Sequence, residues 1–324
     1  MIKADKYFLE TIKEIKENGF DSVNPRTKWA DGMEAHYKYI LPKVFAYDIS
    51  KGEFPINTLR PTAIKGAFHD IAAIYQKQTN IIEDMDPSIH SWWTDFVTSS
   101  TMSEDSDGIR SIGQTYGDTV LRYDLMNRLL EQIHRDPFGR RNLLDLWQVQ
   151  QMIDDPKALV PCCFLTMYTV TEEFLQKDKS VFVQNPNNVV RYVTKKRKLH
   201  LTMVQRSQDY IMTSCINPLQ YTMLGMMICS HLNYIAPPTS DYYYEMGTMT
   251  HFVQNPHIYD RHFPAVEELL QRSGSDQQAT LSLLPIKQTG TILCKNFYDI
   301  EWSDFAVNNY QKPKDLSYRL PIAI

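Results

Sequence analysis

The stretch LHLTMVQRSQDYIMTSCINPLQY, residues 199–221, decides the fold class of this chain. Its first part, 199–207, has the composition of a β-strand. Its last residues open a long apolar segment, 218–233, which is rich in Met and Leu and predicts a buried helix. A strand and a buried helix therefore follow each other closely, and the fold must pack both kinds of element.

The rest of the chain mixes the same two patterns. Strands are predicted at 159–170, at 180–184, in a hairpin at 189–194 that follows a turn at 185–188, and in the tail at 279–284, 291–294 and 297–302. Helices are predicted at 5–18, 62–77 and 120–134. Because these elements do not alternate as regular βαβ units, the sequence predicts an α+β fold. With no internal repeat and no evident linker, residues 1–324 are expected to form one domain.

Composition and charge limit the possible functions. The chain has 324 residues, 43% of them hydrophobic and 22% charged, which is ordinary for a soluble enzyme. The net charge of −4 argues against general nucleic-acid binding, so an anionic ligand needs a local arginine cluster. Five cysteines without a CxxC pair, no apolar leader and no membrane-length segment predict a cytoplasmic protein with reduced thiols. The spacing of Cys and His predicts no metal site.

Cys162 and Cys163 follow Pro161 inside a predicted strand. Most such cysteines are buried core residues, and the residues alone leave that alternative open. Nucleophilic chemistry requires a thiolate, which needs positive charge nearby. Arginines can supply that charge and can also bind a phosphate through paired N–H donors. They occur at Arg26, at the pair Arg140 and Arg141, and at Arg206.

A run of four basic residues, KKRK at 195–198, lies next to the predicted hairpin. Basic side chains at the edge of a sheet prevent edge-to-edge pairing. We therefore expect this run to mark a solvated strand edge rather than a nucleic-acid site.

Several segments, taken in chain order, resemble the motifs of the thymidylate synthase family. They are NPRTKWADG (24–32), GAFHDIAAIYQKQTN (66–80), IGQTYG (112–117), DPFGRRNLLDLW (136–147), LVPCC (159–163), VQRSQDYIMTSCINPLQY (204–221), THFVQN (250–255) and PIAI (321–324). So many motifs in family order are not expected by chance. The resemblance covers nearly the whole chain. It implies a layered fold with a large mixed β-sheet packed by helices, in which the sheet forms the interface of a homodimer.

The resemblance also implies a role for each matching residue. Cys162 attacks C6 of a pyrimidine nucleotide, so that C5 can accept a one-carbon unit from 5,10-methylenetetrahydrofolate. Arg26 and Arg206 bind the phosphate. Arg140 and Arg141 also bind it, and they are supplied by the partner subunit. Base, sugar and bound water are contacted by Gln205, Ser207, Asp209, Asn217 and His251. Asp70, Tyr116 and Asp209 assist proton transfer, while Trp92 or Trp93, Asp209 and the Ile324 carboxylate contact the folate.

Three departures from the family pattern bear on the last step of the reaction. Asp70 stands where Glu is usual, Cys163 where many members have His, and Val253, two residues after His251, where a sugar-binding Tyr is usual. A thymidylate synthase completes the reaction with a hydride and forms dTMP, whereas a hydroxymethylase adds water. Because the shorter acid leaves room for a water, the sequence narrowly favours C5 hydroxymethylation of dUMP, which would suggest a phage enzyme. Thymidylate synthase is the alternative.

The base is predicted from Asn217, because an amide can both donate and accept at the N3 and O4 edge of uracil. We therefore expect dUMP rather than dCMP as substrate, and a dCMP hydroxymethylase is the weaker alternative. A homologue that binds nucleotide without catalysis is a further alternative. The joint presence of Cys162, Arg206, Asp209 and Asn217 argues against it.

Overall fold

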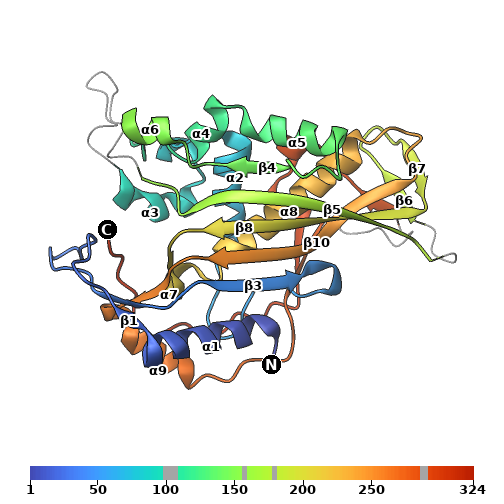
Figure 1. Ribbon diagram of the computed structural model, residues 1–324. Helices are drawn as coiled ribbons and strands as arrows, with labels where there is room; N and C mark the ends of the chain where they lie inside the picture. The colour runs from blue at the N-terminus through green and yellow to red at the C-terminus, as the bar shows by residue number, and fades with distance from the viewer. Residues whose placement is uncertain (98–108, 155–158, 177–180, 285–290) are drawn as a thin grey trace.

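The computed structural model describes residues 1–97, 109–154, 159–176, 181–284 and 291–324. Its centre is a five-stranded sheet in the order β3-β10-β8-β5-β4 (Figure 1). These strands are β3 (Lys43–Asp48), β10 (Tyr242–Val253), β8 (Lys195–Gln205), β5 (Cys163–Phe174) and β4 (Leu143–Asp145). β8 and β10 run parallel and the other neighbours antiparallel. The predicted α+β class with a large mixed sheet is confirmed.

One face of this sheet is buried and the other is open. The buried face carries the row Leu144, Thr166, Met203, His251 and Phe45. Helix α8 (Asn217–Ile235) packs on β8 and β10, and α2 (Ile64–Ala72) packs on α8. The open face carries the row Leu143, Met167, Thr202, Thr250 and Ala46, all at least partly exposed. The long apolar segment predicted as a buried helix is therefore what covers the inner face.

Smaller elements surround this core. The other strands are β1 (Phe20–Asp21), β2 (Tyr37–Tyr39), β11 (Pro256–Tyr259) and β9 (Gln208–Asp209) in one sheet, β13 (Thr291–Leu293), β6 (Val181–Gln184) and β7 (Val190–Val193) in a second, and β12 (Thr280–Leu283) with β14 (Phe305–Asn308) in a third. The other helices are α1 (Lys3–Asn18), α3 (His90–Trp93), α4 (Gly117–Arg122), α5 (Leu125–Arg135), α6 (Val149–Asp154), α7 (Tyr210–Thr213) and α9 (Phe263–Leu270). α1 and α9 lie on the β3 side of the main sheet, and α4, α5 and α6 on the β4 side (Figure 1). None of the helices in the described ranges has the length and apolar character needed to cross a bilayer.

Two predicted elements differ from the structure. The helix predicted at 120–134 is broken between α4 and α5, because Asp124 adopts a left-handed backbone conformation with φ of 51°. The strand predicted at 297–302 is wrong, since these residues form the 3₁₀ turns Phe297–Asp299 and Trp302–Asp304. The strands β10 and β11 and the helix α9 were not predicted.

The basic run at 195–198 also differs from expectation, because it opens β8, a central strand. Acidic residues on both neighbouring strands pair with it. Lys196 Nζ lies 3.3 Å from Glu173 on β5 and 3.2 Å from Glu245 on β10. Arg197 Nε donates to Glu172 at 2.7 Å. The prediction of a solvated edge is therefore wrong, and the run is neutralised by cross-strand ion pairs.

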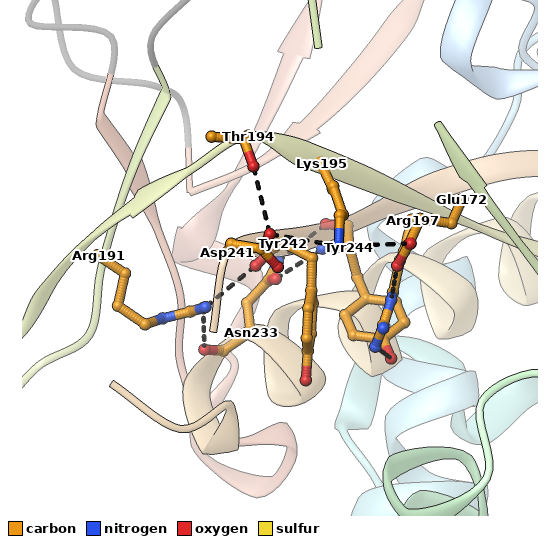
Figure 2. Close-up of polar contacts among 9 residues, drawn as sticks. All are labelled: Glu172, Arg191, Thr194, Lys195, Arg197, Asn233, Asp241, Tyr242 and Tyr244. Atoms are coloured by element: carbon orange, nitrogen blue, oxygen red, sulfur yellow. Dashed lines mark hydrogen bonds and ion pairs between the residues drawn. The ribbon is translucent and has the colours of Figure 1, made fainter. Parts of the chain in front are cut away.

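The same end of the sheet is joined to its surroundings by a buried arginine (Figure 2). Arg191 on β7 is 4% exposed and donates to three main-chain carbonyls, those of Asn233, Tyr242 and Ser240, at 3.1, 3.0 and 3.4 Å. The Asn233 side chain in turn bonds both the N–H and the carbonyl of Tyr244. This network connects the β6–β7 hairpin to the end of α8 and the start of β10.

Candidate active site

The predicted site residues collect where β8 and β10 end and β5 begins. Cys162 directly precedes β5, and Arg206 directly follows β8. The main-chain N–H of Arg206 donates to the carbonyl of Cys162 at 2.9 Å. A register shift between Cys163 and Leu165 marks a bulge in β5, which bends the strand beside the thiol. Two neighbouring strands thus present the cysteine and the arginine at one edge of the sheet.

The loop that carries the thiol is held from two sides. The Arg206 guanidinium donates to the carbonyls of Pro161 and Val160 at 3.0 and 2.8 Å. From the other side, the N–H of Cys162 donates to the hydroxyl of Tyr116 at 2.9 Å. Tyr116 is buried and has φ of 42°, a strained conformation for an aromatic residue. A shallow recess adjoins this loop at Val160 and Pro161.

The electrostatics of Cys162 differ from the expectation of an arginine-activated thiol. Cys162 is half-buried. Burial raises the pKa of its thiol, while Arg206 and Arg26 act in the opposite direction without overcoming it. Arg140 and Arg141 are exposed on the turn between α5 and β4. Within one chain, burial therefore outweighs the arginines. Among the described residues, no group of His, Cys, Asp and Glu is arranged to hold a metal ion.

Asp70 is a buried carboxylate, 5% exposed, with both oxygens engaged. Trp93 Nε1 donates to Oδ1 at 2.6 Å, and Gln220 Nε2 donates to Oδ2 at 2.5 Å. Burial raises the pKa of Asp70 to about 6, although these two hydrogen bonds lower it. Trp93 also contacts Tyr116 edge-to-face, with 5.4 Å between ring centres. Trp92 instead packs over Gly66, so of the two tryptophans it is Trp93 that bonds Asp70.

Asn217 is half-buried at the start of α8, with its amide fixed on both sides. Gln205 Nε2 donates to its Oδ1 at 3.1 Å, and its Nδ2 donates to Gln220 Oε1 at 3.0 Å. His251 donates through Nε2 to Gln205 Oε1 at 2.8 Å. The His251 ring is 1% exposed, and burial lowers its pKa to about 3. The ring faces the interior of the sheet, and its Nε2 atom is already bonded to Gln205. This position argues against the predicted sugar contact.

Two residues of the site were missed in the sequence. His257 and Tyr259 alternate along β11, so their side chains share one face, with 5.0 Å between the ring centres. Burial raises the pKa of Tyr259, and the neighbouring Asp209 and Cys162 act in the same direction. Tyr259 also packs against Trp29, three residues after Arg26. The signal was the His-x-Tyr spacing in a short strand. Counting from His251 instead places Val253 at the Tyr position, which is why this pair was missed.

The C-terminal residues lie against the loop that follows Arg26. Lys28 and Ile324 exchange main-chain hydrogen bonds at 2.7 and 2.9 Å, and Ala323 packs beside Trp29 and Tyr259. The carbonyl of Pro321 accepts from His262 Nε2 at 2.8 Å. The other ring nitrogen of His262 lies 3.5 Å from Asp209 Oδ1. The predicted closing segment thus meets the arginine loop and, through His262, Asp209.

A half-buried thiol beside arginines, a buried carboxylate and an oriented amide are the groups used by enzymes that act on anionic, hydrogen-bonding ligands through a cysteine. Comparison with known proteins makes this class specific. Residues 6–322 match the family model described as thymidylate synthase. The chain is 37% identical over 316 residues to thymidylate synthase of Streptococcus thermophilus and 34% identical over 316 residues to that of Lactococcus lactis subsp. lactis, with 97% of each chain covered.

Among solved structures, the thermostable thymidylate synthase A from Bacillus subtilis matches with a TM-score of 0.73 at 24% identity, covering 99% of both chains. The chain belongs to the thymidylate synthase family. It is therefore a one-carbon transferase, and the one-carbon donor of its family is 5,10-methylenetetrahydrofolate.

Proposed function

We propose that this enzyme is a thymidylate synthase, which converts dUMP into dTMP by reductive methylation at C5. The observation that carries this choice is the engagement of both Asp70 oxygens by Trp93 and Gln220. The sequence argument for hydroxymethylation assumed that the shorter acid leaves room for a reacting water. In the structure, side-chain donors take those positions instead. The curated relatives, named thymidylate synthases, favour the same choice.

The roles of the side chains follow from their positions. Cys162 forms the bond to C6, and Asn217 holds the N3 and O4 edge of uracil. Tyr116, whose hydroxyl contacts the Cys162 N–H, and the buried Asp70 handle protons at the ring. His257 and Tyr259, rather than His251, contact the sugar. Ser207 and Gln205 support the nucleotide from the end of β8, where Gln205 Nε2 donates to the Ser207 carbonyl at 2.9 Å.

The residues present suit a folate on the open side of the nucleotide. Trp93 offers a half-buried ring, Asp209 a carboxylate, and the segment ending at Ile324 a closing wall. When bound, 5,10-methylenetetrahydrofolate supplies the one-carbon unit and the hydride. We infer that Asp209 accepts hydrogen bonds from the folate and that the C-terminal segment excludes water.

We also propose that the enzyme is a homodimer built on the open face of the main sheet. That face carries the apolar side chains of Leu143, Met167 and Val44, which are 48%, 39% and 58% exposed. An uncovered apolar sheet face is stabilised by a second copy of itself. In such a dimer, Arg140 and Arg141 reach the phosphate in the other subunit, join Arg26 and Arg206, and favour the thiolate of Cys162.

The product distinguishes the two reactions. With dUMP and 5,10-methylenetetrahydrofolate, a synthase releases dihydrofolate, seen by its absorbance, and mass spectrometry of the nucleotide shows an added methyl group. A hydroxymethyl product without dihydrofolate would refute the synthase proposal. Cys162→Ser is the control, since it removes the nucleophile and should retain dUMP binding.

The contribution of arginines in trans is tested by complementation. Cys162→Ser and Arg141→Ala should each be inactive alone. When equal amounts are mixed and allowed to exchange subunits, one site of each mixed dimer is intact, and activity should recover to about a quarter of the wild-type value. No recovery despite subunit exchange would mean that Arg141 acts in its own subunit.

A further inference from the structure

Five buried or half-buried side chains, the last of them Asp70, form one continuous line of hydrogen bonds. In every bond of the line, the side chain nearer Asp70 is the acceptor. His251 donates to Gln205, Gln205 to Asn217, Asn217 to Gln220, and Gln220 to the carboxylate. Because every link is a directional amide or imidazole contact, the orientation of each member is coupled to that of its neighbours.

The direction of the line is fixed at both ends. At one end, the carboxylate of Asp70 only accepts when ionised, so the end of Gln220 that meets it must be the NH₂ group. At the other end, Gln205 Nε2 also donates to the main-chain carbonyl of Ser207, which can only accept. Asn217 lies between these fixed points. Its Oδ1 must face Gln205 and its Nδ2 must face Gln220.

This orientation determines which pyrimidine Asn217 can bind. One N–H of its amide and one lone pair of its carbonyl remain for the base, on defined sides. Uracil offers a donor at N3 and an acceptor at O4, whereas cytosine offers an acceptor at N3 and a donor at N4. An Asn217 amide turned by half a rotation would match cytosine instead. Base choice therefore depends on what prevents that rotation.

We propose that Gln220 is a specificity-determining positioning residue, which fixes the Asn217 amide in its uracil-binding orientation by linking it to Asp70. The inference rests on the proposed use of dUMP and deepens it. Gln220 is 4% exposed, so water does not replace its contacts. Both of its amide atoms are bonded, one to Asn217 and one to Asp70. It acts on the base through Asn217 and on proton transfer through Asp70, without touching the nucleotide.

Two substitutions separate these contacts. Gln220→Leu removes both. Gln220→Glu keeps an oxygen facing Asn217 Nδ2 and loses the donor to Asp70. The dissociation constants of dUMP and dCMP are measured by titration calorimetry for the purified full-length protein. We expect Gln220→Leu to lower the preference for dUMP over dCMP by about tenfold, the loss of roughly one hydrogen bond. Gln220→Glu should retain most of the preference.

A pH profile supplies the second readout. The Gln220 bond lowers the pKa of Asp70, so either substitution should raise that pKa further. The acidic limb of kcat should then move to higher pH in both variants. Gln76→Leu is the matched control, because Gln76 is a partly buried amide that donates to the carbonyls of Phe297 and Ile300, away from this line. It should change neither the base preference nor the acidic limb.

An unchanged dUMP-to-dCMP ratio and an unchanged acidic limb in folded Gln220→Leu would overturn the inference. If that variant does not fold, Gln220→Met makes the same test, and Gln220→Glu is informative by itself through the pH profile. Failure of the proposed function looks different. The wild-type enzyme would then show no dUMP binding or would make another product, before any variant is compared.

Discussion

Replacing Arg191 by Met should destabilise the protein strongly without changing its chemistry. Arg191 lies in the network of Figure 2, where its guanidinium donates to the carbonyls of Asn233 and Tyr242. It also donates to the carbonyl of Ser240. Arg197 lies near the start of β8 and Arg206 directly follows it, so nine steps of about 3.3 Å, or about 30 Å, separate this end from the active site. A methionine fills much of the same volume but removes the guanidinium donor from all three carbonyls.

The cost can be worked out from these contacts. A hydrogen bond from a charged donor contributes about 1.5 kcal/mol or more, and the bond of 3.4 Å to Ser240 is weak. The two shorter bonds therefore account for about 3 kcal/mol. Burial lowers the pKa of Arg191 and so disfavours its charged form. Replacing Arg191 by a neutral residue removes this desolvation cost, which offsets part of the roughly 3 kcal/mol. We expect a net loss of about 2 to 3 kcal/mol in the free energy of unfolding.

Urea unfolding followed by circular dichroism measures this loss, at one protomer concentration because dimer stability depends on it. Arg135→Met is the control, because the Arg135 side chain is 69% exposed and contacts its own helix through an ion pair with Glu131 at 3.9 Å and a hydrogen bond to Gln132 at 3.3 Å. That substitution should leave unfolding unchanged. A loss below about 1 kcal/mol for Arg191→Met, or an equal loss for both variants, would refute the reasoning.

Three further predictions concern the active site. The kcat of the wild-type enzyme should fall as pH decreases through about 6, because burial holds the pKa of Asp70 there; a limb near pH 4 would contradict a raised pKa of Asp70 in the working enzyme. Tyr259→Phe should raise the dissociation constant of dUMP by about fivefold, measured by calorimetry, and an unchanged constant would remove its hydroxyl from the sugar site. His262→Asn should speed amide exchange at the C-terminal residues. Burial lowers the pKa of His262, but Asp209 and the Pro321 carbonyl outweigh it and raise the value. The positive charge that strengthens the bond to Pro321 is therefore fully present below about pH 6.5 and is lost as pH rises through the raised value, although the neutral ring can still donate through Nε2. Exchange that is independent of pH, after correction for the intrinsic rate, would disprove this.

The main elements could be predicted where one pattern dominated. The apolar segment 218–233 became the core of α8, and 199–207 fell largely within β8. β10 escaped prediction because YYYEMGTMTHFV combines Met, Gly and polar residues. Its inner face is nevertheless buried by α8, and tertiary packing overrides such weak local preference.

The basic run at 195–198 shows what local composition cannot supply. Whether a strand is central or at an edge depends on its neighbours, which lie far away in the chain. Glu172 and Glu173 come from β5, and Glu245 from β10. Only the register brings these acids opposite the lysines and Arg197. The basic run, which locally is typical of an edge strand, is therefore compatible with a central strand because acidic residues on both neighbouring strands pair with it.

For the candidate site, the sequence indicated which types of residue to expect, but it could not tell which of two similar residues lies there. Trp92 and Trp93 are adjacent, and only the packing of Trp92 over Gly66 shows that Trp93 meets Asp70. His251 and His257 are six residues apart. They differ in the sheet that carries them, since His251 points into the core from β10 while His257 lies on β11 of a small second sheet, beside Tyr259.

Base recognition and closure rest on different parts of this fold. The line from His251 to Asp70 passes through β10, β8, α8 and α2, all elements of the core. A buried amide is stable only when its donor and acceptor are both bonded, so none of these elements can shift without breaking a link. Arg26 lies instead on a loop and Ile324 at the chain end, and a few main-chain bonds join these two segments. We therefore expect the orientation of Asn217 to be set before substrate arrives, and any motion that admits substrate to involve the arginine loop and the C-terminal segment.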